Sequence, residues 1–157
     1  MITEFTEVAS ENDYKIATKL FRQYAAEIAV DLEFQNFSLE IANIKSQYSR
    51  PKGAILLVQN DISTLGCFGI RRFEGTVCEL KRMYLKKEVR GFGIGRLMLG
   101  KSFELGKELG YQKMRLDTLP TMKSAIALYN LMGFYEIEPY RFNPIKGAKF
   151  FEINLGR

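Results

Sequence analysis

The sequence contains no histidine and only two cysteines among its 157 residues. Without histidine, the chain cannot build a Ser-His or Cys-His nucleophile, and it lacks the commonest general base and most zinc sites. Any chemistry must therefore use carboxylates, tyrosine hydroxyls, backbone dipoles or a cofactor. We expect no bound metal.

Signals for export or membrane insertion are also missing. The two cysteines, Cys67 and Cys78, lie in apolar, strand-like segments and are too few for a disulfide framework, so we expect buried free thiols. The sequence has no run of about 18 apolar residues, and its first residues lack a basic-then-apolar signal pattern. These absences predict a cytoplasmic protein with no membrane partner.

Positive charge is in slight excess, with 23 lysines and arginines against 18 aspartates and glutamates, a formal net charge of +5. An excess of this size is typical of an ordinary protein surface, and we expect no nucleic-acid partner. Basic residues gather modestly over residues 81–90, beside a glycine-rich stretch, which suits a phosphorylated cofactor. The length fits one domain over residues 1–157.

Hydrophobic periodicity predicts an α/β fold with a mixed sheet. Helices are expected over residues 13–32, with Asp13 near the cap, 38–47, capped by Ser38, 94–109 and 122–132. Strands are expected over residues 2–8, 54–59, 65–72, 76–85, 114–117, 134–137 and 150–155, with a hairpin turn at Glu74-Gly75. The three consecutive strands should pair antiparallel, with helices on the faces of the sheet.

The glycine-rich stretch RGFGIG, residues 90–95, lies between an expected strand and an expected helix. Glycines let the backbone approach a ligand closely. The first turn of a helix has unpaired N–H groups that carry partial positive charge. Together these features predict a cradle for a phosphate or pyrophosphate, with charge added by Arg90 and Arg96.

Three phosphate-binding patterns compete for this stretch. The dinucleotide pattern G-x-G-x-x-G fails, because Arg96 or Met98 stands where its third glycine is required. The P-loop pattern matches formally over residues 95–102, but Lys101 and Ser102 would then lie inside a helix, two turns from the cradle. The pattern [Q/R]-x-x-G-x-[G/A] is matched in full.

The flanking sequence makes the resemblance specific. The last pattern is the acyl-CoA pyrophosphate loop of the GNAT superfamily, and CELKRMYLKKEVRGFGIG resembles the fourth strand of that family running into the loop. Downstream, AIALYNLMGFYEI is similar to the second family signature, A-x-x-L-Y-x-x-x-G-F, carried by Ala125, Leu128, Tyr129, Gly133 and Phe134. The two motifs stand in the family's order, and the resemblance covers roughly residues 54–138.

The resemblance implies a GNAT-type fold, with a mostly antiparallel central sheet, flanking helices, and fourth and fifth strands that splay apart. It implies an N-acetyltransferase, monomeric or homodimeric, that moves an acetyl group from acetyl-CoA to a primary amine of a small molecule or peptide. The amine would attack directly in a ternary complex. Two alternatives stay open: a GNAT-fold sensor that binds CoA without turnover, and a P-loop-like nucleotide-binding protein.

Cofactor contacts follow from the same resemblance. The pantetheine arm would lie between the splayed strands, and the pyrophosphate would rest on backbone N–H groups of the loop. Many family members have Asn where this chain has Met122, which puts one pantetheine contact in doubt. The implied cofactor-binding residues are Met83, Tyr84, Leu85, Arg90, Gly91, Phe92, Gly93, Ile94, Gly95, Arg96 and Tyr129.

Two catalytic residues are implied as well. Tyr129 occupies the position where the family often has a tyrosine general acid near the cofactor sulfur; the alternative is a core aromatic on the helix stripe, and the full motif match favours the general acid. Glu79 has the spacing of the glutamate base in the histone-acetyltransferase branch, and a structural ion pair with Lys81 or Arg82 is an equal alternative. Asp117, at a strand end, is a weaker candidate base.

The acceptor side should come from the variable parts of the chain. Residues 138–147 form an expected loop rich in proline and aromatic residues, and loops of this kind often line binding sites. A partly apolar pocket without a dense acidic patch is predicted. Its candidate residues are Phe34, Gln35, Phe37, Tyr140 and Phe142.

Overall fold

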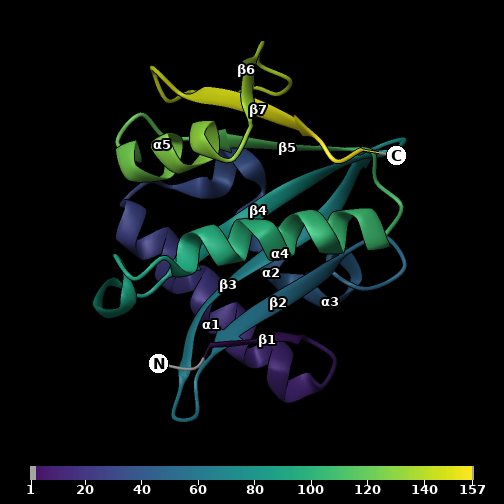
Figure 1. Cartoon of the computed structure of the whole chain (residues 1–157), viewed down its shortest axis with the longest axis vertical. Helices are drawn as coiled ribbons and strands as arrows, with labels where there is room; N and C mark the ends of the chain where they lie inside the picture. Colours follow the sequence, from purple (N-terminus) through teal and green to yellow (C-terminus); the bar gives the residue numbers. More distant parts are fainter. Residues whose placement is uncertain (1–2, 157) are drawn as a thin grey trace.

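The computed structural model describes residues 3–156 and contains a seven-stranded sheet with helices on both faces (Figure 1). The strand order is β1-β2-β3-β4-β5-β7-β6. The strands are β1 (Glu4–Glu7), β2 (Ala54–Gln59), β3 (Thr64–Glu74), β4 (Val77–Leu85), β5 (Lys113–Thr118), β6 (Tyr135–Ile137) and β7 (Lys149–Asn154). All seven predicted strands are present; residue 2 of the first prediction lies outside the described residues.

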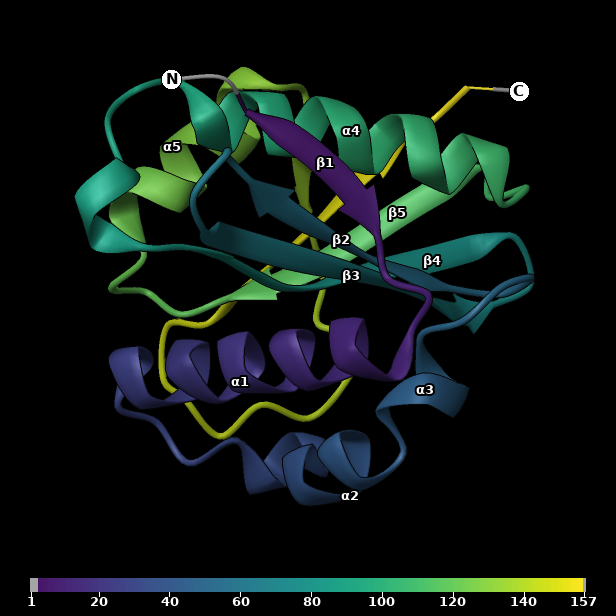
Figure 2. The ribbon, with the colours of Figure 1, turned by 90° about the horizontal axis from the view of Figure 1, so that it is seen from below.

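The helices divide between the two faces. Helices α4 and α5 cover one face, while α1, α2 and α3 lie on the other (Figure 2). They are α1 (Glu11–Ile28), α2 (Phe37–Ala42), α3 (Ile44–Gln47), α4 (Ile94–Glu108) and α5 (Lys123–Leu131), with short 3₁₀ helices η1 (Leu32–Gln35) and η2 (Lys87–Val89). Within residues 3–156, none of the helices has the length and apolar character needed to cross a bilayer.

The bounds of helix α1 differ from the prediction at both ends. Ser10 caps the helix and Asp13 completes a capping box from the third helical position, so the helix begins before Asp13. It ends at Ile28 because Ala29 adopts a left-handed conformation, with φ of 54°. Leu32, predicted to end this helix, instead begins η1.

The single helix predicted over residues 38–47 was also wrong, because the chain forms α2 and α3 with a break at Asn43. Ser38 does not cap it. The residue before α2 is Asn36, in a left-handed conformation with φ of 58°, and the Ser38 hydroxyl bonds to Glu33 instead.

Apolar side chains form two clusters, one on each face of the sheet. The cluster under α4 and α5 includes Phe68, Met98 and Cys78, and the cluster under α1 includes Phe21 and Cys67. Both cysteines are free and fully buried, as predicted. Because the sheet is covered on both sides, the strands between the clusters are held rigidly and can position a site at their ends.

Strands β4 and β5 splay apart, as the family resemblance predicted. They run parallel and pair only from Val77 with Lys113 to Glu79 with Arg115. Strand β4 then continues to Leu85 without a partner on this side, and β5 continues to Thr118. The separation opens a gap in the middle of the sheet, at the carboxyl ends of two parallel strands, where open α/β sheets commonly bind ligands.

Candidate active site

A cavity of about 420 Å³ lies where β4 and β5 separate. We call it the β4–β5 cavity. It is enclosed by the end of β4, the start of α4, the middle of α5 and one side of α1. Six of the residues predicted to bind the cofactor line it: Met83, Tyr84, Leu85, Arg90, Gly95 and Tyr129.

The glycine loop forms the open end of this cavity. Gly91 and Gly93 have φ of 88° and 82°, a conformation that other residues rarely adopt, and a Cβ added at either would meet no atom within 4 Å. Helix α4 begins at Ile94 with Gly93 as its cap, and no side chain bonds to its first turn. The free N–H groups and the open space beside them fit a pyrophosphate.

The other predicted loop residues lie around this cradle. Phe92 is exposed, Arg96 is exposed at the first turn of α4, and the Ile94 side chain is buried in the core, which leaves only its backbone for a ligand. Arg90 fixes the loop to the rest of the site, since its guanidinium pairs with Glu27 at 2.6 Å and donates to the Leu85 carbonyl at 2.7 Å.

Tyr129 lies on α5 with its ring packed against Phe134 and Phe151, at centroid distances of 5.5 and 6.3 Å. The residue is buried and lines the β4–β5 cavity. Among residues 3–156, no group hydrogen-bonds its hydroxyl. Burial, helped by Tyr24 and Asp117, raises the pKa of Tyr129 well above its ordinary value. The hydroxyl is therefore a protonated donor at neutral pH.

A second, smaller pocket of about 30 Å³ adjoins the cavity on the α1 side of the sheet. We call it the Gln35 pocket. Tyr24 and Ile28 line both spaces, so the two meet at α1. Its polar lining residues are Gln35, Lys81, Arg82, Asp117 and Asn143.

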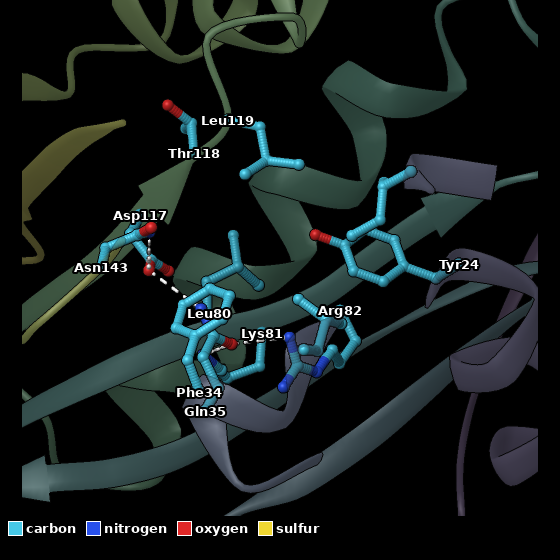
Figure 3. Close-up of a pocket in the computed structure, with 12 residues that line it drawn as sticks. Tyr24, Phe34, Gln35, Leu80, Lys81, Arg82, Asp117, Thr118, Leu119 and Asn143 are labelled. Atoms are coloured by element: carbon cyan, nitrogen blue, oxygen red, sulfur yellow. Dashed lines mark hydrogen bonds between the residues drawn. The ribbon is translucent and has the colours of Figure 1, made fainter. Parts of the chain in front are cut away.

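Figure 3 shows Tyr24 at one side of the Gln35 pocket, with its hydroxyl pointing inward, and Asp117 with Asn143 at the other. Burial is the main cause that raises the pKa of Tyr24 to about 12, with Arg82 acting against it. Tyr24 therefore presents a protonated hydroxyl at the junction of the two spaces.

Gln35 connects the charged groups of this pocket. Its amide oxygen accepts from Lys81 Nζ at 3.2 Å and from Arg82 Nη1 at 2.9 Å. Its amide nitrogen donates to Asp117 Oδ2 at 3.1 Å, and the Asn143 amide lies 3.5 Å from the same oxygen. The Gln35 side chain thus bridges the cationic side of the pocket, Lys81 and Arg82, and its anionic side, Asp117.

A β-bulge places the two cations together. Arg82 has φ of 55°, and the pairing of β4 with β3 shifts between Lys81 and Tyr84. The extra residue breaks the alternation of the strand, so Lys81 and Arg82 both point to the α1 face while Leu80 and Met83 both pack against the core under α4. Bulges of this kind often re-aim side chains beside active sites.

The two cations have different partners. Arg82 is bound by Glu40 in a two-pronged ion pair, with N–O distances of 2.7 and 3.1 Å, and Tyr48 also donates to Glu40. Lys81 is 3% exposed, and its ammonium has Gln35 as its one hydrogen-bond partner within residues 3–156. Burial lowers the pKa of Lys81 to about 8, although Glu79 acts to raise it.

The family model for the acetyltransferase (GNAT) family matches residues 19–134, which is most of the chain. The chain belongs to the GNAT acetyltransferase family. An uncharacterized N-acetyltransferase of Schizosaccharomyces pombe is 36% identical over 93% of this chain and 89% of its own length. The uncharacterized N-acetyltransferase YjgM of Escherichia coli is 28% identical over 80% of this chain and 78% of its own.

Solved GNAT structures share the fold. An acetyltransferase of the GNAT family from Staphylococcus aureus superimposes with a TM-score of 0.78 at 23% identity, covering 98% of this chain and 99% of the other. Membership of the GNAT family makes this chain an acyltransferase that depends on acetyl-CoA.

The positions of Lys101 and Ser102 disagree with the P-loop alternative. Ser102 is fully buried in α4, and its hydroxyl donates to the Leu99 carbonyl. Lys101 lies on the helix surface beside Glu104 and over the Phe5 ring. Neither side chain faces the glycine cradle. Among residues 3–156, no three acidic or thiol side chains gather closely enough to hold a metal ion.

Glu79 lines neither the β4–β5 cavity nor the Gln35 pocket. Its carboxylate accepts from the Tyr140 hydroxyl at 2.9 Å and from Arg141, and Arg71 lies 3.6 Å away. Burial acts to raise its pKa, but Lys81, Arg141 and Arg71 together hold the pKa below its ordinary value. These contacts favour the structural alternative: Arg141 and Arg71 are the direct ion-pair partners, and Lys81, considered from sequence, acts on Glu79 from beyond ion-pair distance.

The residues nominated for the acceptor side separate in space. Phe34 and Gln35 line the Gln35 pocket. Phe37 lies under the Arg82 guanidinium, 5.1 Å from its ring centroid, and the Tyr140 ring packs on Phe73 and Phe150. Phe142 is 76% exposed and lines neither space.

Sequence reasoning missed four polar residues of the pocket. Lys81 and Arg82 carried a signal, because two adjacent cations in an otherwise apolar strand are unusual, but the bulge that turns both to one face was not visible. Tyr24 appeared only as part of a helical stripe. Asn143 lies in the predicted loop, which crosses to the α1 side of the sheet (Figure 2).

Proposed function

We propose that this GNAT protein acetylates a primary amine of a small molecule or peptide by direct attack within a ternary complex. The observation that supports this most is the meeting of two spaces at Tyr24 and Ile28, one fitted to the cosubstrate and one lined by polar side chains. Two substrates bound on either side of this junction would meet without a covalent enzyme intermediate.

The cosubstrate supplies the activated acetyl thioester. Backbone N–H groups of residues 91–96 and the start of α4 hold its pyrophosphate, and the side of β4 that lacks a strand partner holds its pantetheine arm. Beyond Glu79, β4 pairs with β3 on one side and has no pairing with β5 on the other, so main-chain groups on that second side are the ones proposed to hold the arm; the Leu85 carbonyl already accepts from Arg90. Unpaired main-chain N–H groups here would also stabilise the developing oxyanion.

Tyr129 is the proposed general acid. Its hydroxyl is protonated at neutral pH, lines the cavity and is free of hydrogen bonds from residues 3–156, so it can donate a proton to the leaving thiolate. The amine must lose a proton, and Asp117 is the carboxylate that lines the Gln35 pocket. We therefore favour Asp117 or water over Glu79 as the proton acceptor.

Initial-rate kinetics with acetyl-CoA and a panel of primary amines test this function. Direct attack predicts intersecting double-reciprocal lines and N-acetylated product by mass spectrometry. Parallel lines would indicate a covalent acetyl-enzyme and contradict direct attack. Binding of acetyl-CoA without product from any amine would favour the sensor alternative.

A further inference from the structure

The Gln35 pocket holds an unusual cation. The Lys81 side chain is 3% exposed and comes from the middle of a strand, yet no carboxylate among residues 3–156 pairs with it. The nearest acid on its own strand, Glu79, is engaged by Arg141, Arg71 and Tyr140. A lysine ammonium has three donors, and here one of them is used.

Glu79 and Asp117 act to raise the pKa of Lys81, but among residues 3–156 neither carboxylate lies within ion-pair distance of its ammonium. A buried ammonium is costly unless an anion contacts it directly, so the site favours an anionic ligand here. Arg82 is not the cation that would bind an anionic ligand, because its guanidinium is already paired with Glu40 through two hydrogen bonds. The Lys81 ammonium lines the pocket and is the cation left to bind an anionic ligand.

An anionic side chain also belongs to this pocket. Strands β4 and β5 are parallel and in register at Glu79 and Arg115, so Asp117 lies at the level of Lys81 on the other side of the splay. Asp117 lines the Gln35 pocket together with Tyr24, and Tyr24 in turn lines the β4–β5 cavity. Lys81 and Asp117 thus present opposite charges within one small space.

The Gln35 amide indicates which functional groups could bind to Lys81 and Asp117 at the same time. Its oxygen accepts from Lys81, and its nitrogen donates to Asp117 (Figure 3). An amide carries oxygen and nitrogen on one carbon, and an α-amino acid carries its carboxylate and its amine on neighbouring carbons. Gln35 therefore makes the contacts that the carboxylate and the amine of a compact zwitterion would make.

We propose that the acceptor of this enzyme is a small amino acid-like compound, whose carboxylate is held by Lys81 and whose amine lies beside Asp117. This inference rests on the proposed function and names its substrate class. The mixed charge of the pocket disfavours polyamines, which would bring further cations to Lys81 and Arg82.

Matched pairs of acceptors test the proposal. The twenty standard amino acids and the corresponding amino acid amides are compared as acceptors with acetyl-CoA, by kcat/KM and by mass spectrometry of the product. Each amide keeps the side chain and the amine but lacks the carboxylate. We expect at least one acid to exceed its amide by about 10- to 100-fold, the value of a hydrogen-bonded charge.

Lys81→Met removes the charge at nearly constant length. It should raise KM for the accepted acid by about 10- to 100-fold, a larger change than in kcat for the acid or in kcat/KM for the matching amide. Lys101→Met, which removes an exposed lysine of α4, is the matched control and should change neither. If the Lys81 variant fails to fold, the comparison of acids with amides in the unaltered enzyme still decides.

Two results would overturn the proposal while the proposed function stands: amides or diamines acetylated as well as the acids, or Lys81→Met lowering kcat for acid and amide alike, which would make Lys81 a general base. Acetylation of no amine of any class, with acetyl-CoA bound, would instead overturn the proposed function and this inference with it.

Discussion

The two halves of the site are built in different ways. The β4–β5 cavity takes its cradle from the main chain of one continuous stretch, residues 90–96, and the rest of its lining mixes apolar side chains with polar ones such as Glu27 and Lys123. The polar lining of the Gln35 pocket consists mainly of side chains from η1, β4, β5 and the loop after β6. Main chain can bind a cosubstrate that a whole family shares, while side chains from variable segments select the acceptor.

Gly93→Val should have the largest effect, because it alters the main-chain half. The left-handed φ of 82° strains a β-branched residue, and the new side chain would occupy the open space beside the first turn of α4. Losing two charge-assisted hydrogen bonds would cost at least about 3 kcal/mol, or on the order of 100-fold in the Kd for CoA. Isothermal titration calorimetry measures this.

Gly75→Val is the matched control for Gly93→Val. Gly75 also has a positive φ, of 53°, and open space at its Cβ, but it lies in the β3–β4 turn, away from the cavity. Its variant should lose stability and keep its CoA affinity. Equal CoA affinity in the folded Gly93 variant would show that the loop does not bind the pyrophosphate.

Glu79→Gln tests whether this carboxylate belongs to either half. It removes one charge from a buried group of ion pairs, so unfolding should become easier by about 3 kcal/mol. The folded-state pKa of Glu79 lies below its ordinary value, so its stabilisation is present at neutral pH and is lost as the solution is acidified. Denaturant melts from neutral pH down to about pH 3 should therefore converge with those of the unaltered protein.

Glu152→Gln provides the comparison for this loss of stability. Glu152 is also buried and paired, with Arg115 at 2.8 Å, but it lies on β7 outside both spaces. Both variants should keep a pH–rate profile of unchanged form. If activity of the Glu79 variant falls at neutral pH and recovers in alkali, Glu79 is a base and our interpretation of its contacts is wrong.

Tyr129→Phe should act on turnover alone. The ring and its packing remain, and only the hydroxyl in the cavity is lost, so kcat should fall by roughly 10²-fold with little change in CoA affinity. Tyr111→Phe, whose hydroxyl bonds to the Lys52 carbonyl outside the cavity, is the control. Turnover near that of the unaltered enzyme would remove Tyr129 from the mechanism.

The smallest expected effect comes from a change in the side-chain half, Lys81→Met, which should increase the stability of the fold. Burial lowers the pKa of Lys81 to about 8, against an ordinary 10.5. Below pH 8 Lys81 is charged in both states, and its buried charge destabilises the folded state relative to the unfolded state. Lys81→Met should therefore raise the stability at pH 7, by about 1–2 kcal/mol after the loss of the Gln35 hydrogen bond. The unfolded state binds more protons between pH 8 and 10.5, so the unaltered protein gains stability there and the difference should shrink. An equal difference at pH 7 and pH 10.5 would contradict this.

The main-chain half was predictable because its signals are local. The cradle is six consecutive residues, the signature around Tyr129 lies on one helix, and the splay follows from a family resemblance that covers both strands. The predicted helix bounds were wrong at Ala29 and Asn36, where a single residue adopts a left-handed conformation. Neither residue is a glycine, so the sequence did not indicate this conformation.

The side-chain half was predictable only in fragments. Gln35 was nominated, but its partners lie 46, 47 and 82 positions away in the sequence. The bulge at Arg82 turns two neighbouring cations to one face, and an alternating strand pattern assigns them to opposite faces. Tertiary contacts of this range leave no trace in a single sequence.

Ligand binding monitored by thermal unfolding tests the central claim, that the β4–β5 cavity is an acetyl-CoA site, most directly. Acetyl-CoA at a hundredfold excess over its Kd should stabilise the protein by about 2.7 kcal/mol, and ATP with magnesium at the same concentration should give no shift. The acetyl-CoA shift should vanish in Gly93→Val and persist in Gly75→Val. A larger shift with ATP than with acetyl-CoA, or an undiminished shift in Gly93→Val, would contradict the account.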